Sequence, residues 1–179
     1  MRYVALLRTI NAGAESRLSM GQLREALEAA GLTVLATYLQ SGNVVLEAPR
    51  TSGAKLRQRI EAAVQAQLGR PTAAVVLTTK QLERVLASAP SGWADEDGFT
   101  HHLIFVLPPA TVRQVLRGLR FEPDVECVTA NTWVIYWAIR DGARGRSSMR
   151  KLASTPSYSY LTVRTYQLIR RLHELAAAR

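Results

Sequence analysis

The sequence is poor in cysteine and contains no long hydrophobic run. Its one cysteine in 179 residues, Cys127, excludes an internal disulfide framework and a multi-cysteine metal cluster. The longest apolar runs, at residues 3–7 and 103–107, have the length of a β-strand and fall far below the ~18 residues of a membrane span. The first 20 residues show no small-residue cleavage site, so no secretory signal is expected. We therefore expect a cytoplasmic protein without a membrane partner.

Acidic residues are also scarce. The chain has 14 Asp and Glu against 23 Lys and Arg, a net charge of +9. Residues 140–179 hold nine of the cations and two acids, whereas residues 1–139 are nearly balanced, with 14 cations and 12 acids. A concentrated positive field of this kind attracts phosphate and carboxylate groups. A solvated basic face without a partner fits the same pattern equally well.

The rest of the composition, 47% hydrophobic and 21% charged, is typical of a globular protein with one domain or two small ones. Hydrophobic periodicity in the first half predicts a strand, a helix, two strands, a helix and a strand. Their expected bounds are residues 3–7, 19–30, 33–38, 44–46, 52–68 and 73–77. This order is that of the ferredoxin-like βαββαβ unit.

The second half repeats this order in a weaker form. Its expected elements are a strand at 103–107, a helix after Pro108-Pro109, a hairpin of strands 125–129 and 133–138, and a final helix over 163–177. We therefore predict an α+β fold of two ferredoxin-like subdomains in tandem. The expected bounds are 1–78 for the first subdomain, 79–100 for a connector helix and linker, and 101–179 for the second, with its basic segment and C-terminal helix.

Three motifs carry a resemblance to a known family. Residues 3–13 read YVALLRTINAG, residues 38–45 read YLQSGNVV, and residues 151–164 read KLASTPSYSYLTVR. They resemble the R-x-I-N loop, the Q-S-G-N turn and the closing K-L…P-x-Y…T-x-R pattern of the domain of unknown function 1697 family. The resemblance implies a bacterial, cytoplasmic protein of two ferredoxin-like subdomains with no established activity. Thr9 stands where a glycine is usual, and its bulk would narrow a loop that cradles a ligand.

The first two motifs lie at strand ends and are rich in amides, hydroxyls and glycine, which suits them to bind a ligand. The first and third strands of a βαββαβ unit are antiparallel neighbours, so the two loops should lie side by side. Cations from the closing motif would attract a phosphate or carboxylate bound between the two halves. The predicted ligand-binding residues are Arg8, Asn11, Gln40, Ser41, Asn43, Lys151 and Arg164. The competing interpretation is structural, because Ser-Gly-Asn is common in hairpin turns and Asn11 can cap a loop.

Two other functions stay open at this point. A nucleic-acid-binding module would contact phosphates through Arg144, Arg146 and Arg150. An enzyme would act on a phosphorylated or acyl substrate through Ser41 or Tyr158 near Lys151. The sequence holds neither the P-loop nor the dinucleotide-binding glycine motif, so no cofactor is predicted.

The remaining chemistry-bearing residues are interpreted as structural. His101 and His102 are adjacent on a strand and point to opposite faces, so no metal site is predicted. Cys127 is expected to point inward as a small apolar group. The aromatic residues of the strand 133–138 are expected in the core rather than stacked on bases. The acids at 95–97 are expected to be solvated.

Overall fold

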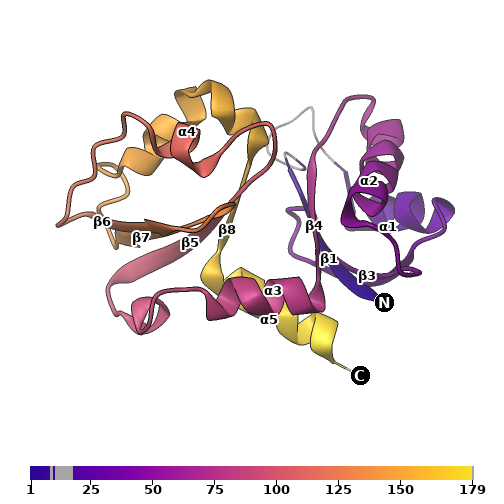
Figure 1. Cartoon of the computed structure of the whole chain (residues 1–179). Coiled ribbons are helices and arrows are strands. Elements are labelled where there is room, and N and C mark those ends of the chain that lie inside the picture. Colours follow the sequence, from indigo (N-terminus) through magenta and orange to yellow (C-terminus); the bar gives the residue numbers. More distant parts are fainter. Residues whose placement is uncertain (9, 11–17, 179) are drawn as a thin grey trace. The chain divides into compact units, whose positions relative to one another are not determined.

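A computed structural model of the chain describes residues 1–8, 10 and 18–178 (Figure 1). The chain divides into two compact units. The first comprises Met1–Arg84 and Arg170–Arg179, and the second comprises Val85–Ile169. Each unit contains a four-stranded antiparallel sheet, which confirms the expected α+β fold with two sheets.

The first unit has its strands in the spatial order β2-β3-β1-β4. Its elements are β1 (Arg2–Leu7), α1 (Met20–Ala29), β2 (Thr33–Tyr38), β3 (Asn43–Glu47), α2 (Gly53–Leu68) and β4 (Ala74–Thr78). Both α1 and α2 cover one face of this sheet (Figure 1), because each carries a stripe of leucine, isoleucine or valine that packs on β1 and β3. The buried residues of the two helices are Leu23, Ala26, Leu27, Leu56, Ile60 and Val64.

Local sequence signals set the helix ends of the first unit. The Ser19 hydroxyl accepts a hydrogen bond from the Gln22 amide at 3.1 Å, and the Gln22 side chain accepts one from the Ser19 amide at 2.9 Å. This capping box confirms the expected start of α1. Ser52 caps α2 with one hydrogen bond, which its hydroxyl accepts from the Lys55 amide at 3.2 Å. Gly69 ends α2 in the left-handed conformation, with φ of 66°.

The second unit arranges its strands in the corresponding spatial order, β6-β7-β5-β8. Its strands are β5 (Phe99–Val106), β6 (Glu126–Ala130), β7 (Val134–Arg140) and β8 (Leu161–Thr165). Its helical segments are η2 (Trp93–Asp95), α4 (Val112–Leu116), η3 (Ser148–Ser154) and η4 (Pro156–Tyr160), the η segments being 3₁₀ helices. The expected equivalence of residues 3–7 and 103–107 is confirmed, since β1 and β5 occupy the same place in their sheets.

Strand β8 corrects the sequence-based prediction of a helix over 163–177. Residues 161–165 pair antiparallel with β5, with Leu103 opposite Arg164, and the helix α5 (Tyr166–Ala177) begins only afterwards. The segment is rich in β-branched residues, which fit a pleated surface. Its pairing partner lies about 60 residues earlier in the chain, outside the range of any local signal.

The compact units differ from the domain bounds 1–78, 79–100 and 101–179, which stay a prediction. The boundary between the units falls inside α3 (Thr79–Ala87) and inside α5, so residues 170–179 group with the first unit. Within that unit, the Arg2 guanidinium donates hydrogen bonds to the Ala176 carbonyl, at 3.2 Å, and to the Ala178 carbonyl.

Strand β6 reverses the expected orientation of its side chains. Cys127 is exposed, whereas Glu126 is 3% exposed, so the prediction of an inward-pointing cysteine was wrong. Glu126 lies opposite Ile139 and Val128 lies opposite Trp137, and these two β7 residues belong to the core of the second unit. Directly opposite residues share one face of a sheet, so Glu126 and Val128 face the core. The aromatic prediction is confirmed for Tyr136 and Trp137, which are buried.

Candidate functional site

The turn at residues 40–43 connects β2 to β3, and its polar groups hold the turn together. Asn43 is fully buried, and its side-chain amide donates to the Tyr38 carbonyl at 2.9 Å and to the Ser41 hydroxyl oxygen at 2.8 Å. Gly42 has φ of 72°, and a Cβ added there would lie 2.8 Å from the Cβ of Leu7. Glycine is therefore required by both conformation and space. Ser41, Gly42 and Asn43 therefore have a structural role in this hairpin turn.

Arg8 lies beside this turn, as the topology predicted. Leu6 pairs with Asn43, and the Leu7 amide donates to the Gly42 carbonyl at 2.8 Å, so the next residue along β1 adjoins the turn. The Arg8 backbone is fixed from the other side, because its amide donates to the Ala73 carbonyl at 2.8 Å. Asn11, the remaining predicted residue of this loop, lies outside the described residues.

Lys151 and Arg164, the two cations predicted from the closing motif, belong to the second unit. Lys151 is exposed on η3. Arg164 is half-buried on β8, where its guanidinium donates to the Val163 carbonyl at 2.8 Å. Burial lowers the pKa of Arg164 to about 10, so the side chain is still charged at neutral pH. Their approach to the turn at residues 40–43 stays a prediction.

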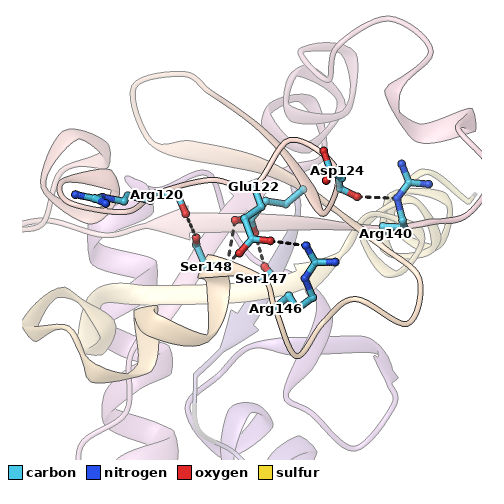
Figure 2. A network of polar contacts seen from close by, with 8 residues as sticks. Arg120, Glu122, Asp124, Arg140, Arg146, Ser147 and Ser148 are labelled. Atoms are coloured by element: carbon cyan, nitrogen blue, oxygen red, sulfur yellow. Dashed lines mark hydrogen bonds and ion pairs between the residues drawn. The ribbon is translucent and has the colours of Figure 1, made fainter.

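The basic segment after β7 is exposed but largely tied to its own unit. Arg144, Arg146 and Arg150 are all exposed, as expected. Figure 2 shows Arg146 bound to Glu122, at 2.7 Å, and Arg140 bound to the Asp124 carbonyl, at 2.7 Å. The Arg150 guanidinium donates to the Gly145 carbonyl at 2.6 Å. Among the described residues, none forms a hydrogen bond or ion pair with the Arg144 side chain.

The buried carboxylate of Glu126 holds the C-terminal end of this basic segment, where η3 begins. Glu126 accepts hydrogen bonds from the Trp137 indole at 2.9 Å, from the Ser148 amide at 3.1 Å, and from the Ser147 hydroxyl. Ser147 is also the N-cap of η3, and the Ser148 hydroxyl donates to the Arg120 carbonyl (Figure 2). Burial alone would raise the pKa of Glu126, but these hydrogen bonds outweigh it and the pKa is lowered. The carboxylate therefore anchors the start of η3 as a charged group.

Sequence reasoning missed Glu126 because a glutamate in a strand normally faces solvent. The one signal that pointed toward it was Trp137. An indole N–H in the core needs an acceptor, and the neighbouring strand had to supply one.

The second unit contains a cavity of about 240 Å³ that is lined in part by η3, and we call it the η3 cavity. Its lining residues are Ile139, Arg144, Met149, Arg150, Leu152, Ala153, Tyr158 and Val163. Five of these are apolar, two are arginines, and within the described part of the chain no acid lines the cavity. The η3 cavity can therefore hold a small molecule that combines an apolar part with a negative charge.

A second cleft in this unit, of about 510 Å³, has the opposite charge. It is lined by residues 94–101 and by Asp141, Thr165 and Gln167. Residues 95–97 are exposed, which confirms the expectation that these acids are solvated. Burial lowers the pKa of His101 although the carboxylates of this cleft act to raise it. No group of three or more His, Cys, Asp or Glu residues is placed to hold a metal ion in the described ranges.

The protein thus consists of two α+β units, and the second contains a small cavity lined by apolar residues and two arginines. The chain belongs to the family of proteins of unknown function DUF1697, whose model matches residues 1–136. The structure of a conserved bacterial protein from Streptococcus pneumoniae is similar, with a TM-score of 0.83, 23% sequence identity and 98% of each chain covered. This likeness shows the fold alone. No curated protein matches the chain. In the described residues, no helix is long and apolar enough to span a membrane.

Proposed function

We propose that the protein binds a small anionic molecule, carrying a phosphate or carboxylate group, in the η3 cavity. The observation that carries this proposal is that apolar side chains line the cavity together with Arg144, whose side chain has no hydrogen-bond or ion-pair partner among the described residues. A guanidinium presents parallel N–H groups that match the two oxygens of a carboxylate or phosphate. Arg144 also acts on a histidine of the same unit. Burial is the main reason why the pKa of His102 is lowered, and the positive charge of Arg144 lowers it further.

The size and composition of the η3 cavity restrict the ligand further. At about 240 Å³ it is smaller than the ~300–1,000 Å³ of sites for drug-sized ligands. Met149, Leu152 and Val163 favour a compact apolar group such as one aromatic ring or a short acyl chain. A small aryl or acyl anion therefore fits better than a nucleotide.

The nucleic-acid alternative has less support. Arg146 and Arg150 already hold partners within the unit, so a phosphate backbone would have to compete with Glu122 and with the Gly145 carbonyl. Binding through three phosphate contacts would weaken with a log–log salt slope of about −2.7 on duplex DNA. A slope of this size would favour nucleic acid over a small ligand.

Two finer predictions belong with this proposal. We propose that each unit is a ferredoxin-like unit, on the basis of the strand orders β2-β3-β1-β4 and β6-β7-β5-β8. The wider ligand set from the sequence stays a prediction; its members are Arg8, Asn11, Gln40, Ser41, Asn43, Lys151 and Arg164. The enzymatic alternative also stays a prediction. Of its candidate residues, Tyr158 lines the η3 cavity.

The test is a calorimetric titration with phenyl phosphate, and with benzoate and inorganic phosphate for comparison. The double variant Arg144→Ala/Arg150→Ala should bind phenyl phosphate at least ~10-fold more weakly, because a hydrogen bond to a charged group contributes about 1.5–3 kcal/mol. The matched control is Arg113→Ala/Arg117→Ala, which removes two exposed arginines of the same unit that do not line the cavity. Equal binding by both double variants would contradict the proposal.

A further inference from the structure

Three cations line a separate cavity in the first unit, and none of their side chains has a hydrogen-bond or ion-pair partner in the part of the chain that the structure describes. The cavity measures about 340 Å³ and lies where the loop after β3 meets the first turns of α2; we call it the α2 cavity. Its charged lining residues are Arg50, Lys55 and Arg59, all exposed, and no acid lines it within the described ranges. None of these three side chains forms a hydrogen bond or ion pair with a described residue.

This arrangement opposes the usual electrostatics of a helix. Lys55 and Arg59 are four residues apart, so two like charges lie on one face of α2. The N-terminal end of a helix carries a partial positive charge that favours acids, yet the first turn of α2 has none. Elsewhere on the same helix the common pattern holds, since Arg57 pairs with Glu61 at 3.8 Å. The α2 cavity is therefore a site of uncompensated positive charge.

The elements that carry these cations are fixed by the core and by the β1 strand. The Tyr3 hydroxyl accepts a hydrogen bond from the Thr51 amide at 3.3 Å, which fixes the loop next to Arg50. Met1 and Ala48 exchange two backbone hydrogen bonds at the start of the same loop. The helix is anchored by buried leucine and isoleucine side chains. The backbone around the α2 cavity is thus held by the core of the first unit.

Arg59 is further restrained by the turn that follows α1. A Cβ added to Gly31 would lie 2.6 Å from a terminal nitrogen of the Arg59 guanidinium. The guanidinium therefore lies against the turn backbone, in space that only a glycine leaves open.

We propose that the α2 cavity binds a phosphate group, either as free phosphate or as part of a small phosphate ester. Two guanidinium groups and one ammonium group match the charge and the several acceptor oxygens of a phosphate dianion better than those of a single carboxylate. This site belongs to the first unit, so it does not depend on ligand binding in the η3 cavity.

The experiment is an NMR titration of the whole chain with inorganic phosphate and, separately, with glycerol 3-phosphate, at constant ionic strength. We expect saturable shifts of the amides around residues 48–59 in the unmodified protein. The variant Lys55→Gln/Arg59→Gln should lose them. The control Lys80→Gln/Arg84→Gln should keep them, because it removes a lysine and an arginine at the same spacing on another helix of the first unit.

The two ligands distinguish the two sources of the phosphate group. Tighter binding of glycerol 3-phosphate indicates a phosphate ester, and equal or weaker binding indicates free phosphate. Shifts that persist unchanged in Lys55→Gln/Arg59→Gln would overturn the proposal, as would the absence of saturation with both ligands. A melting-temperature series with and without phosphate gives an independent reading, since bound phosphate should stabilise the unmodified protein and the control but not the cavity variant.

Discussion

The two units use the same strand order but join the third strand to the fourth in different ways. In the first unit the connection is α2, a 16-residue helix with a serine cap at its start and a left-handed glycine at its end. In the second unit it is η3 and η4, of seven and five residues, which are too short to bury a continuous stripe. The long helix is stabilised by its own capping and packing, whereas the start of η3 is held by the buried carboxylate of Glu126.

This difference explains where the cavities lie. The regular helix α2 packs its apolar stripe closely on the sheet. The α2 cavity is found at the N-terminal end of this helix, where the loop after β3 joins it. In the second unit the η3 cavity is lined by Leu152 of η3, by Tyr158 of η4 and by residues of β7 and β8. The irregular connection therefore provides a cavity and requires an anchor.

The largest expected effect comes from removing this anchor. Glu126→Ala leaves the Trp137 indole, the Ser147 hydroxyl and the Ser148 amide without their buried acceptor. We expect the free energy of unfolding to fall by about 3 kcal/mol or more, since each unsatisfied buried group costs about 1–3 kcal/mol. Urea denaturation measures the loss. The control Glu122→Ala removes an exposed partner of Arg146 and should cost less than about 1 kcal/mol.

The pH dependence of stability should show the same anchor. The pKa of Glu126 is lower in the folded chain than its ordinary value of 4.5. Its contribution is therefore fully present above about pH 4.5 and is lost as the pH falls through the folded-state pKa. In urea melts from pH 7 to pH 3, Glu126→Gln should differ most from the unmodified protein at pH 7. A constant difference across this range would show that the charge of Glu126 does not anchor η3.

Removing the cap of the regular helix should have a smaller effect. Ser52→Ala deletes the acceptor for the Lys55 amide, and we expect a loss of about 1 kcal/mol. Denaturation of this variant beside Glu126→Ala compares the two connections directly. A larger loss from Ser52→Ala than from Glu126→Ala would reverse the comparison between the units.

The smallest effect is expected at Cys127. Because the side chain is exposed, Cys127→Ser should change the free energy of unfolding by less than about 0.5 kcal/mol. The thiol should also react with a disulfide reagent such as Ellman's reagent in the folded protein, at a rate unchanged by sub-denaturing urea. Reaction only upon unfolding would mean that β6 presents Cys127, rather than Glu126, to the core.

Much of the fold could be predicted because its signals are local. The capping boxes at Ser19 and at Thr78 set the starts of α1 and α3, and both are formed by residues three positions apart. Strand β8 could not be predicted in this way, because its pairing with β5 depends on residues far away in the chain. Alternation along β6 indicates which residues share a face, but not which of the two faces is buried.

The positive charge of the candidate site could be predicted from the sequence, but the residues that pair with its arginines could not. The exposure of Arg144, Arg146 and Arg150 follows from their clustering in a basic segment. The pairing of Arg146 with Glu122 depends on the path of the chain before β6, which the sequence does not reveal. Likewise, the Ser-Gly-Asn motif is visible in the sequence, but only the buried Asn43 amide shows that it serves the turn.

The central claim is that the η3 cavity holds an anion with an apolar part. A crystal structure of the protein grown with phenyl phosphate tests this claim most directly. We expect density for the phosphate within hydrogen-bond distance of the Arg144 guanidinium, with the ring against Met149, Leu152 or Val163. Well-defined density for the ligand at another place on the second unit, with the η3 cavity empty of it, would contradict the account.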